Sequence, residues 1–246
     1  MDQRRAVVHA LIPAAGCGQR FGGGHLKQYL RIAGRPVLAH TIDAIKQHPV
    51  ISGITIVLAA GDNKFAELFD SDDFELRTVT GGSSRAESVL NGLQSIRNDL
   101  PEVEWVLVHD AARPCLPYSC LENLLEKGLA EPDGAILAIP VADTLKRSDS
   151  AGKITQTLDR RDLWCAQTPQ LFPVDLLSSA LATMLQNGET PTDEAQAMER
   201  MGAKPLMVMG SPANIKITWP EDVAIVEAWF AAENTRKATV LQIGKL

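Results

Sequence analysis

Short apolar runs alternate along the chain with segments of helical periodicity, and this alternation limits the fold more than any other feature. The apolar runs predict strands at Val7–Pro13, Gly53–Ala59, Leu76–Val79, Trp105–His109, Gly134–Ile139 and Pro205–Met209. Several, such as Ile54–Leu58, are apolar at nearly every position, which is typical of strands covered on both faces. We therefore expect an α/β protein with a Rossmann-like, mostly parallel, doubly wound sheet whose ligands bind at the carboxyl edge.

Helices are predicted between these strands, and several carry recognisable start signals. The expected ranges are Val37–Gln47, Asn63–Phe69, Arg85–Arg97, Ser119–Leu129, Val174–Gln186 and Asp193–Met201. Ser84 and Glu87 have the spacing of a capping box, which satisfies free amides at the start of a helix. A last helix is expected after Pro220, where a proline and two acids suit a helix N-terminus.

The segment 140–167 departs from this alternation. Two short alternating stretches flank the polar turn Ser148–Gly152, which indicates a protruding β-hairpin arm. An isolated hairpin is only marginally stable in water, so we expect the arm to pack on a second subunit and form a homodimer. The expected organisation is one domain over residues 1–234, including this arm, and a peripheral tail over residues 235–246.

Composition disfavours several classes of protein. The chain has 24 Lys and Arg against 30 Asp and Glu, a net charge of −6, which disfavours a nucleic-acid partner. No apolar run approaches the roughly 20 residues that span a bilayer, so no membrane partner is expected. The four cysteines lack the spacing of a zinc site, which favours reduced thiols and a cytoplasmic location.

The loop after the first strand carries the most informative chemistry. Small residues and two cations follow one another there, namely Ala14, Ala15, Gly16, Gly18, Arg20 and Lys27. Small residues let backbone amides approach an anion closely. Phe21 replaces the third glycine of a dinucleotide fingerprint, and His25 after Gly24 excludes a Walker loop. These observations favour a nucleoside triphosphate site, with a flexible, solvated turn as the alternative.

Asp110 directly follows the predicted strand Trp105–His109, so it lies where ligands bind to such sheets. Its carboxylate suits a nucleotide or Mg²⁺, held directly or through water, because this ion prefers oxygen ligands. Capping of the turn Ala111–Pro114 is the alternative role. The neighbouring His109 is more typical of a packed strand residue than of a catalytic base.

The first loop is followed along the chain by further short motifs, and together they occur in the same order as in a known family. They are Pro13–Arg20, Lys27–Tyr29, Gly81–Gly82, Arg85 with Ser88, Val108–Pro114, Asp143–Thr144, Asp159–Arg160, Gln167–Gln170, Thr192–Ala195 and Asn214–Thr218. Together they resemble the 2-C-methyl-D-erythritol 4-phosphate cytidylyltransferases, within the nucleotide-sugar pyrophosphorylase-like superfamily. The resemblance extends from about residue 8 to 230, and it implies a nucleotide-diphospho-sugar transferase-like fold.

The resemblance implies transfer of CMP from CTP to methylerythritol 4-phosphate, with a divalent cation such as Mg²⁺ as cofactor. The nucleotide would contact Ala14, Ala15, Gly16, Gly18, Gly81, Gly82, Arg85, Ser88, Asp110 and Ala111. Arg20 and Lys27 would hold the triphosphate and the transition state. The sugar phosphate would contact Arg113, Thr144, Arg160, Thr168 and Lys216, with Arg160 supplied by the arm of a neighbouring subunit.

The chemistry requires no nucleophilic side chain. A phosphate monoester has a second pKa of about 6, so the acceptor is largely dianionic at neutral pH. Catalysis is then expected to depend on positioning and on cations that neutralise the two anions. Three alternatives remain: a ribitol 5-phosphate cytidylyltransferase, a sugar-1-phosphate uridylyl- or guanylyltransferase, and a nucleotide-binding regulatory module.

Overall fold

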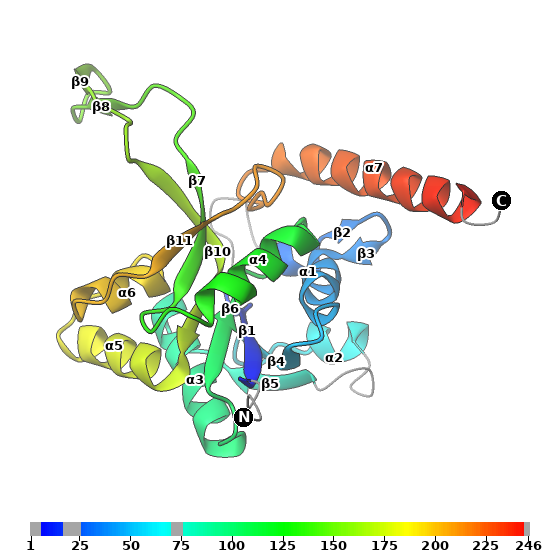
Figure 1. The fold of residues 1–246 in the computed structure, drawn as a ribbon, viewed down its shortest axis with the longest axis horizontal. Helices are drawn as coiled ribbons and strands as arrows, with labels where there is room; N and C mark the ends of the chain where they lie inside the picture. The colour runs from blue at the N-terminus through cyan, green and yellow to red at the C-terminus, as the bar shows by residue number, and fades with distance from the viewer. Residues whose placement is uncertain (1–5, 17–25, 70–75, 244–246) are drawn as a thin grey trace.

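A seven-stranded, mostly parallel sheet forms the centre of the computed structural model, which describes residues 6–16, 26–69 and 76–243 (Figure 1). The strand order is β11-β7-β10-β6-β1-β4-β5. The strands are β1 (Val8–Pro13), β4 (Ile51–Leu58), β5 (Leu76–Thr80), β6 (Trp105–Val108), β7 (Ala135–Pro140), β10 (Trp164–Pro173) and β11 (Leu206–Met209). All six predicted strands are present, each within two residues of its expected ends.

The sequence did not predict β10, the strand that runs antiparallel to both of its neighbours, β6 and β7. It contains Gln167, Pro169 and Gln170, and proline and polar residues are unusual in a central strand. The pairing with β7 is irregular between Ala166 and Gln170, so this polar stretch interrupts the ladder. Within this stretch, the hydroxyl of the buried Thr168 contacts His109 and Asp110, the two residues that follow β6.

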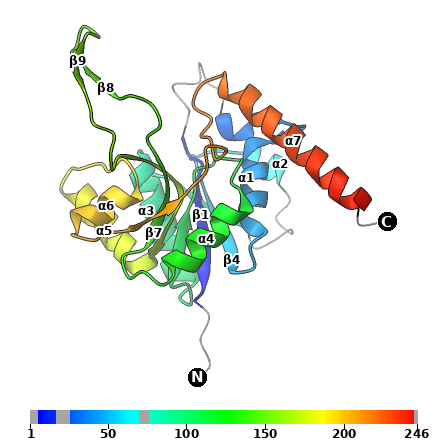
Figure 2. The same ribbon diagram turned by 45° about the horizontal axis from the view of Figure 1, so that its top comes forward.

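Helices cover both faces of the sheet, as the doubly wound prediction requires. They are α1 (Val37–Lys46), α2 (Lys64–Leu68), α3 (Arg85–Asp99), α4 (Tyr118–Gly128), α5 (Val174–Gln186), α6 (Glu194–Arg200) and α7 (Asp222–Ile243). Leu38 of α1 and Leu121 of α4 belong to the core on one face. Leu93 of α3 and Leu181 of α5 belong to the core on the other face. Figure 2 shows α3 and α5 on the opposite side of the sheet from α1. Among the described residues, no helix is both long and apolar enough to cross a membrane.

The capping box at α3 is confirmed, with one additional contact. Ser84 Oγ accepts a hydrogen bond of 3.1 Å from the Glu87 amide. The Glu87 carboxylate accepts from the amide of Ser83 at 2.7 Å, in addition to a hydrogen bond from the backbone of the cap residue Ser84. The first turn of α3 is thereby fixed beside the loop that contains Gly81 and Gly82.

Two small hairpins lie outside the main sheet. The strands β8 (Lys146–Ser148) and β9 (Ile154–Thr157) pair antiparallel, as predicted, in an arm that projects from the body (Figure 1). The arm is shorter than the predicted range 140–167, because residues 164–167 belong to β10, a strand of the main sheet. Every residue of these two strands is exposed. The second hairpin, β2 (Arg31–Ile32) with β3 (Arg35–Pro36), has strands of two residues each and was not predicted.

The helix α7 packs on a third apolar cluster, beside β2 and α1. Ile32, Val37, Cys115, Ile217 and Val226 form the buried part of this cluster. The cluster fixes the segment that precedes α7 against the first half of the chain. Lys216 is therefore presented from an anchored backbone, although it lies far from Lys27 and Asp110 in sequence.

Candidate functional site

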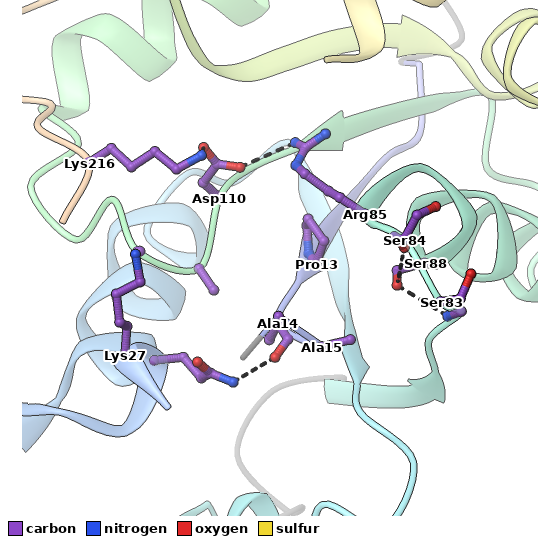
Figure 3. A pocket seen from close by; sticks show the side chains of 15 residues that line it. Pro13, Ala14, Ala15, Lys27, Ser83, Ser84, Arg85, Ser88, Asp110 and Lys216 are labelled. Carbon is purple, nitrogen blue, oxygen red and sulfur yellow. Dashed lines mark hydrogen bonds and ion pairs between the residues drawn. The ribbon is translucent and has the colours of Figure 1, made fainter. Parts of the chain in front are cut away.

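A cavity of about 310 Å³ lies beyond the carboxyl ends of β1 and β6 (Figure 3). This is the edge at which the fold class predicts ligands. Many of the predicted site residues line it, namely Ala14, Ala15, Gly16, Lys27, Gly82, Arg85, Ser88, Asp110, Ala111 and Lys216. Gly18 and Arg20 lie outside the described residues.

Close backbone approach shapes one wall of the cavity. A Cβ atom on Gly81 would lie 2.8 Å from the Cβ of Ala15, so a side chain there would force the two loops apart. Ser88 Oγ accepts from the Gly82 amide at 3.1 Å and donates to the Ser84 carbonyl at 2.8 Å. Gly81, Gly82 and Ser88 therefore build the wall, and the small residues leave room for a ligand against the backbone.

The opposite wall carries Lys27, which lies in the short 3₁₀ turn Lys27–Tyr29. Its neighbour Gln28 is buried and donates to the Ala14 carbonyl at 2.6 Å, which ties this turn to the end of β1. Lys27 Nζ donates to the Ile217 carbonyl at 3.2 Å. The ammonium group of Lys27 is therefore placed beside the segment that carries Lys216.

Asp110 is the centre of a charge cluster between these walls. Its Oδ1 lies 3.2 Å from Arg85 Nη2, and its Oδ2 lies 2.9 Å from Lys216 Nζ and 3.4 Å from Arg113 Nε. Figure 3 shows Arg85 and Lys216 reaching Asp110 from opposite sides. Burial alone would raise the pKa of Asp110, but the three cations outweigh it and hold this pKa well below its usual range.

Glu194 completes the cluster from the start of α6. Its side chain is only 1% exposed, and its two oxygens lie 2.6 and 3.0 Å from the guanidinium of Arg85. Three cations then face two carboxylates, which leaves one positive charge in excess beside Lys27. A site suited to anions thus forms in a chain whose net charge is −6.

Glu194 was missed as a site residue by the sequence interpretation. The motif Thr192–Ala195 contributes to the family resemblance, but a helix start was the favoured role for its two acids and neither was named as a site residue. Asp193 does cap α6, because its Oδ1 accepts from the Gln196 amide at 2.9 Å. The burial of the adjacent Glu194 depends on its distant partner Arg85, and no local pattern signals that contact.

A second cavity of about 210 Å³ adjoins the first. The two cavities share Arg85, Asp110 and Lys216 as lining residues. Arg113 and Thr168, both predicted to contact the sugar phosphate, line the second cavity. The charge cluster therefore lies between two neighbouring spaces, which could hold two anionic ligands next to each other.

Thr144 and Arg160 do not reach these cavities within one chain. Both side chains are exposed on the arm, and Arg160 donates to the Ala142 carbonyl. Neither residue lines either cavity. Their role at a site therefore stays a prediction that requires a second copy of the chain.

The described residues contain no group of three or more His, Cys, Asp or Glu side chains able to hold a metal ion. Asp110 was the predicted contact, directly or through water. Both of its oxygens are already paired with Arg85, Lys216 or Arg113. A metal ion bound directly to either oxygen would lie next to these cations and be repelled by them, which favours a contact through water.

Comparisons with known proteins agree on one family. A model of the 2-C-methyl-D-erythritol 4-phosphate cytidylyltransferase family matches residues 8–232. The protein of this name from Vibrio parahaemolyticus is 45% identical over 224 residues, which cover 91% of this chain and 95% of that protein. Its counterpart from Shewanella oneidensis is 47% identical over 223 residues, covering 91% and 88%.

Solved structures give the same result. A crystal structure of 4-diphosphocytidyl-2C-methyl-D-erythritol synthase superposes with a TM-score of 0.81 and 38% identity, covering 92% of this chain and 99% of that one. The 2-C-methyl-D-erythritol 4-phosphate cytidylyltransferase of Francisella tularensis superposes with a TM-score of 0.78 and 30% identity, covering 90% and 99%. The structural similarity therefore spans about nine tenths of the chain.

Proposed function

The chain belongs to the 2-C-methyl-D-erythritol 4-phosphate cytidylyltransferase family, and on this basis we propose that it transfers CMP from CTP to 2-C-methyl-D-erythritol 4-phosphate. The products are 4-diphosphocytidyl-2-C-methyl-D-erythritol and pyrophosphate, in the non-mevalonate route to isoprenoids. One observation carries the assignment to the site: two cavities share a charge cluster with surplus positive charge. The reaction requires two anions to meet at such a place.

We assign CTP to the larger cavity. Its volume of about 310 Å³ lies within the range of small-molecule sites, and glycine and alanine leave room for a flat base. Lys27, together with Arg20 of the same loop, would neutralise the triphosphate. Gly81, Gly82 and Ser88 supply a wall on which the nucleoside can rest.

The acceptor phosphate would enter from the second cavity and meet Lys216 and Arg113. An oxygen of the monoester attacks the α-phosphorus of CTP and forms a new P–O bond. The bond from the α-phosphorus to the bridging oxygen of the β-phosphate breaks, and pyrophosphate leaves with that electron pair. The cations contribute by holding both anions in line and by stabilising charge in the transition state.

A divalent magnesium ion bound with CTP would offset part of the triphosphate charge. Because the Asp110 oxygens are paired with cations, we propose that the nucleotide and water supply its direct ligands, with Asp110 contacting it through water. Asp110 itself keeps Arg85, Arg113 and Lys216 aligned for the incoming phosphates. We also propose the cytoplasm as the location, since charged phosphate esters do not cross apolar membranes unaided.

The proposal predicts CTP-dependent release of pyrophosphate with methylerythritol phosphate as acceptor. The acceptor and nucleotide panels should include ribitol 5-phosphate, UTP and GTP, and a preference for any of these would contradict the assignment.

Lys27→Ala and Arg20→Ala should each lower kcat by on the order of 10²-fold, as for other lost transition-state donors. Lys64→Ala is the matched control, because Lys64 is exposed away from both cavities.

We propose further that the arm completes the site of a second copy in a homodimer. The exposed arm strands, and the distance of Arg160 and Thr144 from the cavities of their own chain, support this arrangement. Arg160→Ala should then raise the KM for the sugar phosphate and leave the KM for CTP unchanged. Mixed dimers of Lys27→Ala and Arg160→Ala chains should regain activity, and no recovery in verified mixed dimers would argue against a shared site.

A further inference from the structure

A chain of hydrogen bonds runs behind the second cavity through the buried side chain of His109. Its Nε2 lies 3.0 Å from the carbonyl oxygen of Arg113, and its Nδ1 lies 3.0 Å from Thr168 Oγ1. Thr168 Oγ1 also accepts from the Asp110 amide at 3.0 Å. His109 and Thr168 are 0% and 4% exposed, so these contacts are largely shielded from bulk water, and Thr168 also lines the second cavity.

The partners of His109 fix the direction of every hydrogen bond in this chain. A carbonyl oxygen only accepts, so Nε2 must carry a hydrogen. A neutral imidazole has one N–H, which leaves Nδ1 as an acceptor. Burial lowers the pKa of His109 to about 4, in agreement with a neutral ring at physiological pH. The single hydrogen of the Thr168 hydroxyl is therefore directed at Nδ1.

We infer that His109 is a positioning residue that makes Thr168 a pure acceptor toward the second cavity, so that Thr168 binds a hydroxyl of the polyol and not its phosphate. Of the two lone pairs on Thr168 Oγ1, the Asp110 amide occupies one and the other remains for the ligand. A phosphate dianion has no hydrogen to donate, so its oxygens would be repelled by this lone pair. A polyol hydroxyl can donate to it. The inference rests on the proposed function.

The other side chains that line the second cavity also differ in whether they can donate or accept a hydrogen bond from a ligand. Lys216 and Arg113 are donors without acceptor capacity, which suits a phosphate. Gln167 and Gln170 have both ends of their amides engaged, with Ser211 and with Asp193 and Ala195, respectively. The cavity therefore offers the phosphate donors at Lys216 and Arg113 and offers the polyol an acceptor at Thr168. The carboxylates of Asp110 and Asp193, which also line it, are paired with Arg85 and Lys216 and with Gln170 and Gln196, respectively.

The tautomer of His109 tests the inference directly on the unaltered chain. Nitrogen-15 NMR of the imidazole at neutral pH should show the hydrogen on Nε2 and a bare Nδ1. A hydrogen on Nδ1, or a doubly protonated ring, would overturn the inference. This measurement needs no substitution, so it holds even if variants at this buried position fail to fold.

Kinetics with matched variants provides the second test. His109→Gln keeps an amide that can reach the Arg113 carbonyl but removes the acceptor near Thr168, whereas His109→Asn places an amide oxygen where Nδ1 lies. We expect His109→Gln to raise the KM for the polyol phosphate about fivefold to tenfold, the effect of one hydrogen bond, with the KM for CTP unchanged. His109→Asn should recover most of this loss. Equal effects of the two variants, or an equal rise in both KM values, would overturn the inference.

Thr168→Val separates the two parts of the ligand. It should weaken binding of the polyol phosphate about fivefold to tenfold and leave inhibition by inorganic phosphate unchanged, while Thr168→Ser should resemble the unaltered chain. Equal weakening of both ligands would show that Thr168 contacts phosphate and would overturn the inference. Absence of turnover in the unaltered chain would instead contradict the proposed function, so the two failures are distinguishable.

Discussion

Arg85 and Asp110 show how single residues prepare the site for anions before any ligand arrives. Arg85 contacts Glu194 through both ends of its guanidinium and reaches Asp110 with one of them. Asp110 in turn holds Lys216 and Arg113. Each cation is therefore oriented by a buried carboxylate, which reduces the reorganisation needed when phosphates bind.

The contact between Glu194 and Arg85 should contribute substantially to stability. Glu194→Gln keeps the shape of the side chain but removes the charge that faces Arg85. Breaking one partner of a buried pair typically costs about 3–5 kcal/mol, and we expect about 2–3 kcal/mol here because Arg85 is partly exposed. Urea unfolding followed by circular dichroism measures the change in the free energy of unfolding.

Glu189→Gln is the matched control for that substitution. Glu189 pairs with Arg200 at 3.1 Å, but both side chains are exposed, at 44% and 63%. An exposed pair contributes about 0–1 kcal/mol, so the control should change the free energy of unfolding by less than about 1 kcal/mol. Similar losses in the two variants would show that the burial of Glu194 contributes nothing.

The elements that could be predicted from sequence are those with their own local signal. The strands β1, β4 and β6 are apolar runs, and the arm hairpin alternates around a polar turn. The strand β10 has no such signal, because Pro169 and two glutamines interrupt it. Its central position depends on pairing with β6 and β7, which is tertiary information.

The same distinction holds for the site. The loop glycines, Lys27 and Asp110 were expected at the carboxyl edge because each follows a predicted strand or belongs to a motif. Glu194 was not expected, because its role comes from a contact with Arg85 that no spacing reveals. His109 was correctly expected as a packed residue. Its link to Thr168, on which the inferred positioning role depends, requires the fold of β10.

The turn into β7 provides a prediction at the scale of one element. Gly134 has a φ of +78°, and a Cβ atom there would lie 2.3 Å from the Leu171 carbonyl oxygen and 2.5 Å from the Phe172 ring. Gly134→Ala must therefore displace the β10 backbone as well as adopt a left-handed conformation. We expect a loss of at least about 3 kcal/mol in the free energy of unfolding, measured by urea titration.

Gly152 is the matched control, because a side chain there has the cost of a positive φ without the steric clash with β10. Its φ is +77°, nearly the same, but no atom lies within 4 Å of its Cβ position at the turn of the arm. Gly152→Ala should cost only about 1 kcal/mol, the penalty for a left-handed alanine. Equal losses at the two positions would mean that the contact with β10 does not matter.

At the scale of the whole molecule, the C-terminal part of the chain closes a site that the N-terminal part begins. The Ile217 carbonyl accepts from Lys27, and the Asn214 carbonyl accepts from Arg113 at 2.7 Å. Lys216 lies between them and contacts Asp110. The packing of α7 on the β2 and α1 side of the body anchors this segment (Figure 2). One short segment thereby positions three cations, and its own position depends on α7.

The stability of the whole chain should fall on mild acidification because buried histidines, above all His9 and His109, carry no charge in the folded state. Burial lowers the pKa of His9 and of His109 to about 4 in the folded state, against 6.5 when unfolded. The unfolded chain therefore binds more protons between these values, and folding loses stability as pH falls from about 6.5 toward 4. Between about pH 7 and pH 5 we expect a loss on the order of 3 kcal/mol, measured by urea unfolding at each pH.

His9→Gln, which can keep a hydrogen bond to Thr55, should remove about half of this dependence. An unchanged free energy of unfolding across this range would contradict the neutral, buried state of both rings.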